Sequence, residues 1–414
     1  MNRRIPLLFT FTLIFVLWIV PTNTFANTDI TMNLNSKTSI LIDASTGEVL
    51  YDDQSGKRMY PASITKILTG ILALESGKLN EDVTISEKAS EAEGTSVYLL
   101  KGEEMKLHQL VKGMLINSGN DAGVAVAEHL SGSVDRFAKK MNTFVEKKLS
   151  LKDSHFTNPH GLFDENHYTT AYDMAYITKY ALQNPKFRKI VSTKEMPWVG
   201  DGWKTTLYNH NRLLWRYDGA IGVKNGYVDQ SQHTLVTAAK RNGTTLIAVT
   251  MKANTTEQSY EDTIALLDYG FAHFETGTIK KGTILLSANG KEIRVKEDKL
   301  FTHNIGEGFE ATVDKEGHLV VENNQGEELA SFPVVPKLDQ SVKASDDSGG
   351  KTSQGTVGFL SFVTSILPMV VLGVLLLAAF LIIYRIRRNL RNRRLERMRR
   401  RRIVDDLQHD VFRR

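Results

Sequence analysis

Two long apolar segments, one near each end of the chain, decide how much of it is free to fold in water. Residues 1–26 begin with Arg3 and Arg4, continue through an apolar run and end on the small-residue pattern of residues 24–26. This order predicts a secretory signal peptide, with an uncleaved anchor as the alternative because the run is long. Residues 358–384 predict one membrane-spanning helix. The part that must fold outside the cytoplasm lies between these two segments.

Positive charge is concentrated in the last thirty residues. The tail 385–414 contains 13 arginines and four acidic residues, so it dominates the formal net charge of +5. Arginines directly after an apolar span mark the cytoplasmic side, and they also attract anionic lipid; a topology signal without lipid binding is the alternative. The basic balance is therefore no indication of a nucleic-acid partner. The chain has no cysteine, which excludes disulfides and thiolate metal sites. Together these features predict a bacterial cell-membrane protein with a single C-terminal anchor and a body that faces the cell wall.

The exported part of the chain contains two regions with different sequence patterns. Residues 27–274 contain strand patterns, a helical insert and strand patterns again, which predicts an α+β fold with an antiparallel sheet and helices packed on it. Residues 275–336 alternate in short runs and predict a small all-β domain, and residues 337–357 are a Ser/Asp/Gly-rich linker. The expected elements of the first part are a hairpin at 38–51, helices at 107–117, 121–130, 137–149, 170–183 and 258–274, and strands at 220–227, 234–239 and 246–251.

Ser63 and Lys66 stand three residues apart at the expected start of a buried helix that follows Pro61. Residues at this spacing share one helix face, so the two side chains can touch. A hydroxyl beside a desolvated lysine amine can pass on its proton as it attacks a carbonyl. A helix cap with a surface lysine is the plainer alternative. The same spacing at Ser348 and Lys351 has no apolar support, and we interpret it as chance.

Two further polar elements follow in the chain. Ser118 and Asn120 lie in a run of turn-favouring residues between two expected helices. Lys224, Asn225 and Gly226 end an apolar strand, with a simple hairpin turn as the alternative for Asn225-Gly226. Three such elements in this order are much less expected by accident than any one of them.

This constellation resembles the penicillin-binding protein and serine β-lactamase superfamily, whose signatures are S-x-x-K, S-x-N and K-T-G. Within it, the sequence is most similar to the low-molecular-mass D-alanyl-D-alanine carboxypeptidases, and the run Asn158-Pro159-His160-Gly161-Leu162 adds to that likeness. The resemblance covers roughly residues 30 to 335. It implies a β-lactamase-like transpeptidase domain that cleaves D-Ala-D-Ala stem peptides of peptidoglycan and is acylated by β-lactam antibiotics, without a metal or other cofactor.

The resemblance also implies roles for individual residues. Ser63 would be the nucleophile, Lys66 its base and Ser118 a proton relay to the leaving group. Asn120 would hold the substrate backbone, and Lys224 with Asn225 and Gly226 would receive the terminal carboxylate. The backbone NH groups of Ser63 and Tyr227 would form the oxyanion hole.

Asn225 departs from the family pattern, which has threonine in the third signature, and this leaves other functions open. One is a catalytically silent peptidoglycan- or β-lactam-binding membrane protein; others are a D,D-endopeptidase and a β-lactamase. The sequence shows no clear acidic loop motif of the kind that a β-lactamase uses for deacylation.

Two groups of aromatic and imidazole side chains have plainer interpretations. His155, His160 and His167 do not have zinc-site spacing, and we expect loop packing. Trp198, Trp203, Trp215 and Tyr208 suit either a substrate cleft or ordinary packing.

Overall fold

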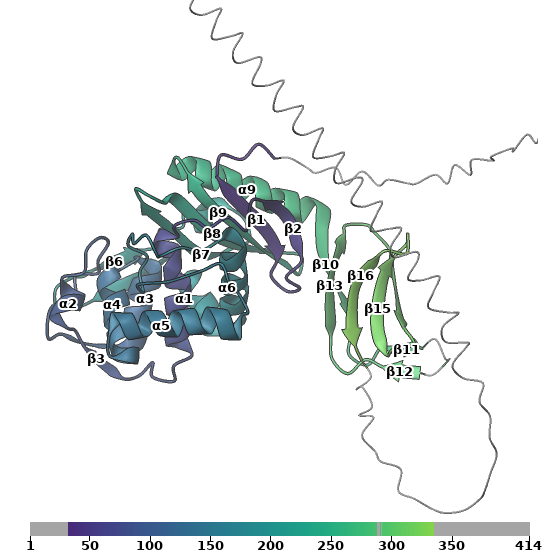
Figure 1. Cartoon of the computed structure of the whole chain (residues 1–414), viewed down its shortest axis with the longest axis horizontal. Coiled ribbons are helices and arrows are strands. Elements are labelled where there is room, and N and C mark those ends of the chain that lie inside the picture. The colour runs from purple at the N-terminus through teal and green to yellow at the C-terminus, as the bar shows by residue number, and fades with distance from the viewer. Residues whose placement is uncertain (1–31, 288–289, 291, 335–414) are drawn as a thin grey trace, which may run out of the picture. The chain divides into compact units, whose positions relative to one another are not determined.

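The largest sheet pairs strands from distant parts of the chain. The computed structural model describes residues 32–287, 290 and 292–334. Its largest sheet is antiparallel with the spatial order β2-β1-β9-β8-β7 (Figure 1). The bounds are β1 Thr38–Asp43, β2 Val49–Asp53, β7 Ala220–Val228, β8 Gln232–Arg241 and β9 Thr244–Ala253. In this sheet Ile40 of β1 is paired with Val249 of β9. The expectation that strands before and after the helical insert share one sheet is confirmed.

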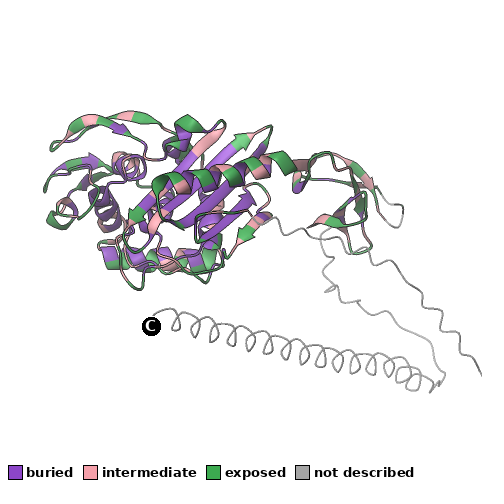
Figure 2. Ribbon diagram, turned by 90° about the horizontal axis from the view of Figure 1, so that it is seen from above, coloured by how far each residue is buried: buried purple, intermediate pink, exposed green. Residues whose placement is uncertain are grey.

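The central strands are buried on both faces, which explains their unbroken apolar sequences. Successive side chains of a strand point to opposite faces. Ile40 and Ile42 therefore join the core formed with the helical insert, whereas Leu41 joins Leu266 of α9 (Thr256–His273) in a second core. Figure 2 shows the strands of this sheet mostly in the colour of buried residues. The sheet is thus a rigid support for residues at its edge.

The helical insert lies between β2 and β7 in the sequence. Its helices are α1 Lys66–Leu74, α2 Glu87–Ser90, α3 Leu107–Ile116, α4 Asn120–Ser131, α5 Val134–Thr143, α6 Ala171–Gln183, α7 Pro185–Val191 and α8 Leu213–Arg216. Two hairpins interrupt it, β3 Asp82–Thr84 with β4 Glu104–Lys106 and β5 Glu195–Val199 with β6 Lys204–Tyr208. The helices expected at 107–117, 121–130, 170–183 and 258–274 match α3, α4, α6 and α9 within two residues at each end. The helix expected at 137–149 is α5 followed by a π-helical turn, Phe144–Lys148.

The structure refines three local expectations. Ser63 lies in a 3-10 turn, Ala62–Thr65, which leads directly into α1 at Lys66, so the two residues do stand at the start of a buried helix; Ala62, at the start of this turn, has a φ of 50°. Asn120 is the first residue of α4 instead of a loop residue. Asn225 and Gly226 pair with β8 near the end of β7, so the strand expected at 220–227 is confirmed and the alternative of a hairpin turn is wrong.

The last described strands form three small sheets. They are β10 Phe274–Ile279 with β13 Lys299–Asn304, β11 Ile284–Leu286 with β12 Glu292–Arg294, and β14 Phe309–Val313 with β15 His318–Asn323 and β16 Glu328–Pro333. Phe301, Leu319 and Val321 lie in their common core. The all-β character of residues 275–336 was predicted, but β13 was missed, and so was β10, which continues directly from α9.

Several predicted segments fall outside the described residues. These are the signal peptide 1–26, the linker 337–357, the membrane span 358–384 and the tail 385–414. Within residues 32–287, 290 and 292–334, no helix combines the length and apolar character needed to cross a bilayer.

Candidate active site

Ser63 and Lys66 meet at the start of α1. The Lys66 Nζ atom lies 2.9 Å from the Ser63 Oγ atom, within hydrogen-bond distance. The Ser63 side chain is partly exposed, whereas Lys66 is fully buried. The 3-10 turn that carries Ser63 thus leaves the hydroxyl accessible while the amine beside it is shielded from solvent.

Two carbonyl oxygens also contact the Lys66 amine. Its Nζ atom donates to Asn120 Oδ1 and to the backbone oxygen of His160, each at 2.7 Å. Burial, and then the charge of Lys224, place the pKa of Lys66 well below its usual value. A neutral amine has two N–H groups and one lone pair, and carbonyl oxygens can only accept. Once the two carbonyls take the N–H groups, the lone pair is left for the Ser63 hydroxyl, which is the arrangement that a general base needs.

Asn120 is fixed from behind by an extended loop. Its Nδ2 atom donates to the oxygen of Glu93, and its backbone NH donates to the oxygen of Thr95, each at 2.6 Å. The buried carboxylate of Asp121 accepts from the backbone NH groups of Val97 and Leu99 and holds the same loop. No motif in the sequence indicates this supporting role of Asp121.

Ser118 lies just before α4 in the left-handed region, with a φ of 67°. It is buried, and none of the residues that the structure describes makes a hydrogen bond with its hydroxyl. Its side chain therefore keeps both donor and acceptor capacity.

Lys224, Asn225 and Gly226 lie in β7 at the edge of the main sheet. The Lys224 Nζ atom donates to the Asn225 backbone oxygen at 2.8 Å and to Asn225 Oδ1 at 3.3 Å. Burial lowers the pKa of Lys224 to about 7. A Cβ atom on Gly226 would lie only 2.6 Å from the Ser63 backbone nitrogen. The third element therefore lies directly against the turn that carries Ser63. Tyr227 is 55% exposed, and its hydroxyl donates to Asp229.

Sequence reasoning missed two polar residues of this region. Thr234 of β8 donates to the Pro61 backbone oxygen at 2.8 Å and so ties the sheet to the start of the Ser63 turn. His210 has its pKa lowered to about 4 by burial and by the nearby charges of Lys224 and Lys66. Neither residue stands in a recognisable motif, and only the folded chain brings Thr234 to the Ser63 turn and His210 near the two lysines.

The loop Asn158–Leu162 supplies one of the two carbonyl oxygens that contact Lys66. Its His160 oxygen contacts Lys66, and Asn158 Oδ1 accepts from the Gly161 NH at 2.7 Å. Gly161 has a φ of +90°, and a Cβ there would lie 1.8 Å from the Ala62 oxygen. Only glycine fits this close approach.

The other histidines and aromatic residues singled out in the sequence differ in how far they are buried. His167 Nε2 bonds Thr65 Oγ1 at 2.9 Å, and burial lowers its pKa to about 3. Trp198 is buried in the core, whereas Trp215 is 47% exposed. Tyr208 lines a cavity of about 690 Å³ together with His210, Arg212 and Asn225.

Comparison with known proteins places this geometry in a family. The model of the D-alanyl-D-alanine carboxypeptidase family, peptidase S11, matches residues 23–255. The chain belongs to this family. The D-alanyl-D-alanine carboxypeptidase DacF of Bacillus subtilis is 35% identical over 345 residues, which cover 79% of this chain and 88% of DacF. DacA of Haemophilus influenzae is 33% identical over 76% of this chain and 82% of its own length.

Solved structures agree with the assignment to the D-alanyl-D-alanine carboxypeptidase family. Penicillin-binding protein 5 from Haemophilus influenzae superposes with a TM-score of 0.64 at 29% identity, over 73% of this chain and 96% of that one. A mutant of the Streptomyces K15 DD-transpeptidase superposes with a TM-score of 0.55 at 29% identity, over 58% of this chain and all of that one. The recognition of the superfamily from three short motifs is thereby confirmed.

Proposed function

We propose that this protein is a serine D-alanyl-D-alanine carboxypeptidase that removes the terminal D-alanine from peptidoglycan stem peptides and is acylated by β-lactams. The observation that carries the proposal is the Lys66 amine, which is buried, has two carbonyl partners and lies 2.9 Å from the Ser63 hydroxyl. No carboxylate contacts this amine among the described residues, and burial together with the charge of Lys224 lowers its pKa more than the charge of Asp121 raises it.

Acylation follows from these contacts. The Ser63 Oγ atom attacks the carbonyl carbon of the penultimate D-alanine, and its proton passes to the neutral Lys66 amine. The backbone NH groups of Ser63 and Tyr227 stabilise the oxyanion, a contribution of about a hundred- to a thousandfold in rate. Ser118 relays a proton to the departing amine as the peptide C–N bond breaks, and D-alanine leaves. Its unpartnered hydroxyl and its place beside Asn120 support this role.

Deacylation reverses the proton path. A water molecule attacks the ester carbon and gives its proton to Lys66, and the proton then returns to the Ser63 oxygen as the C–O bond breaks. The side-chain oxygen of Asn120 accepts from Lys66, and its NH2 group donates to the Glu93 oxygen. One N–H and one lone pair of this amide remain, and these would hold the substrate backbone.

Recognition of the free carboxylate is assigned to Lys224 on β7, supported by Asn225 and Gly226. A charged ammonium beside a carboxylate forms a strong charge-assisted hydrogen bond. Here the Asn225 side chain and backbone already accept from Lys224. That observation favours a second candidate, a protein that binds stem peptides or β-lactams with slow or no turnover.

The cellular setting is part of the same proposal. Residues 1–26 act as a signal peptide, residues 27–274 form the catalytic domain and residues 275–336 form a β domain that serves as a spacer. Residues 337–357 link it to a membrane helix at 358–384, and the tail 385–414 lies on anionic lipid of the cytoplasmic leaflet. The catalytic domain faces the cell wall.

Release of D-alanine separates the candidates. The full chain is incubated with a pentapeptide that ends in D-Ala-D-Ala, and free D-alanine is measured together with covalent labelling by penicillin. A carboxypeptidase gives catalytic release that Ser63→Ala abolishes. Labelling at Ser63 without release supports the second candidate, and release that survives Ser63→Ala rejects both.

A further inference from the structure

A cavity of about 570 Å³ lies at the opposite end of α1 from Ser63. Its walls come from the C-terminal end of α1, from α3 and from α7, and none of the residues that line it is assigned a role in catalysis at Ser63. Leu74, Ile116 and Ile190 supply an apolar surface. A concave, largely apolar site of this size falls in the range that accommodates small organic ligands.

Lysines give this cavity a single sign of charge. Lys112, Lys186 and Lys189 line it, and none of its described lining residues is acidic. None of the three lysines has an ion-pair partner among the described residues. Lys186 and Lys189 are exposed, whereas Lys112 is half-buried.

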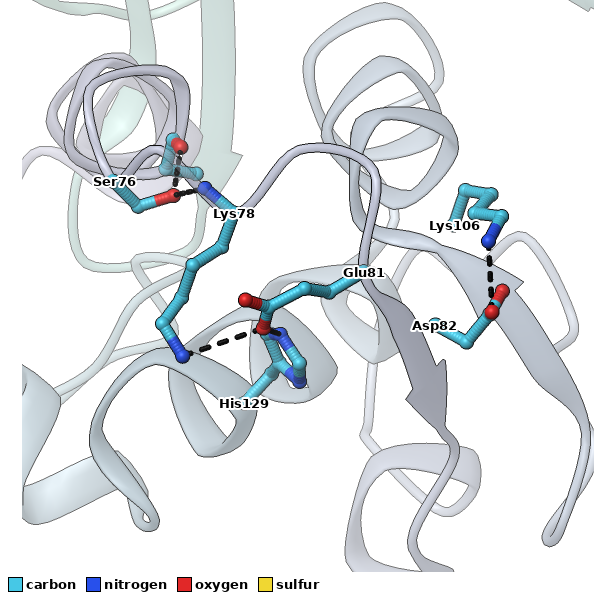
Figure 3. A network of polar contacts seen from close by, with 7 residues as sticks. Ser76, Lys78, Glu81, Asp82, Lys106 and His129 are labelled. Carbon is cyan, nitrogen blue, oxygen red and sulfur yellow. Dashed lines mark hydrogen bonds and ion pairs between the residues drawn. The ribbon is translucent and has the colours of Figure 1, made fainter.

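The acidic side chains of the adjoining segment are occupied elsewhere. Glu81 contacts Lys78 at 3.3 Å and His129 at 2.8 Å, and Asp82 contacts Lys106 at 2.7 Å (Figure 3). These contacts leave the lysines of the cavity without a protein counter-charge from that segment.

A polar atom without a partner lies in the same wall. The Nδ1 atom of His108, which lines the cavity from α3, is buried and has no hydrogen-bond partner among the described residues. Burial, and then the charge of Lys112, lower the pKa of His108, so the imidazole is neutral at physiological pH. A buried, unsatisfied polar atom costs free energy unless a ligand or water completes it.

We propose that this cavity binds an anionic amphiphile, a phosphate or carboxylate group attached to a short apolar body. The three lysines hold the anionic group, and the surface formed by Leu74, Ile116 and Ile190 receives the apolar part. The site is separate from Ser63, and the inference does not depend on the proposed enzymatic activity.

Photo-crosslinking of the full chain tests the proposal. The probe is octyl phosphate with a diazirine in its alkyl chain, and chymotryptic peptides are searched for the label by mass spectrometry. We expect saturable labelling of peptides from α3 and α7, suppressed by excess octyl phosphate but not by equal concentrations of octanol or inorganic phosphate.

Two charge-matched double variants sharpen the test. Lys186→Gln with Lys189→Gln is expected to reduce labelling about tenfold, because two charge-assisted contacts are lost. Lys139→Gln with Lys140→Gln removes the same charge from exposed positions of α5 and is expected to leave labelling unchanged.

Four results overturn the proposal. Equal competition by octanol indicates a purely apolar trap, and equal competition by inorganic phosphate indicates a simple charged patch. Label that is absent or spread over other peptides removes the site. Equal labelling of the two double variants removes the role of the lysines.

Discussion

Gly226→Ala tests whether β7 and the Ser63 turn are held together as the catalytic geometry requires. The added Cβ would lie 2.6 Å from the Ser63 nitrogen and 2.7 Å from Thr234 Oγ1, whereas ordinary contacts begin at 3.4 Å. The turn or the strand must therefore move by roughly 0.8 Å, the difference between 3.4 and 2.6 Å. The new methyl group also covers the NH that we assign to the oxyanion hole.

Both effects act on acylation. A displacement near 1 Å can cost about a hundredfold in rate, and loss of one oxyanion donor about a hundred- to a thousandfold. We expect the second-order rate constant for labelling by a fluorescent penicillin to fall by about two to three powers of ten. Overpacking should cost only about 1–3 kcal/mol of stability, so the variant should still fold.

A matched glycine provides the control. A Cβ on Gly56 would meet no atom within 4 Å, so Gly56→Ala should be acylated at the wild-type rate. Thermal unfolding of each variant shows whether the fold is retained. A folded Gly226→Ala protein with a labelling rate close to that of Gly56→Ala would refute the proposed contact between the third element and Ser63.

Four further predictions concern Lys66, Lys224, Asn225 and His167. Lys66→Met keeps the buried volume but removes the base, so penicillin labelling should fall by about a hundred- to ten-thousandfold, and an unchanged rate in a stopped-flow assay would exclude Lys66 as the base. The profile of kcat/KM against pH should rise as Lys66 loses its proton and fall above about pH 7 as Lys224 loses its charge. Asn225→Thr should raise kcat/KM, because it removes the amide oxygen that accepts from the Lys224 Nζ atom at 3.3 Å. A decrease in kcat/KM would show that the amide assists binding. The pKa of His167 falls from 6.5 in the unfolded chain to about 3 in the folded one, so the folded state resists protonation and stability should drop as pH decreases through this window, by about 5 kcal/mol at most. Urea unfolding should show a smaller loss for His167→Gln, and equal losses would contradict the assignment.

Local patterns were enough to predict the elements of the main sheet and most of the helical insert. The hairpin expected at 38–51 is present as β1 and β2, which pair antiparallel at one side of the main sheet. The spacing of Ser63 and Lys66 likewise places two side chains on one helical face, and their atoms are in contact. Such features depend on residues that are close in the sequence.

Other features depend on contacts between distant segments and could not be predicted. The His160 backbone oxygen reaches Lys66 because the glycine after it lets the loop pass close to Ala62. Backbone carbonyls carry no sequence signature. The strand expected at 220–227 includes Lys224-Asn225-Gly226, but only pairing with β8 excludes the hairpin turn that Asn225-Gly226 also suggests, since tertiary context overrides local preference.

The assignment of Ser63 as a nucleophile activated by an uncharged Lys66 is tested most directly by locating the penicillin adduct. The full chain is treated with penicillin, its intact mass is measured, and the modified peptide is sequenced by mass spectrometry. The account predicts one adduct per chain, attached to Ser63 and absent from Ser63→Ala. An adduct on another residue such as Ser118, or one that persists in Ser63→Ala, would contradict it.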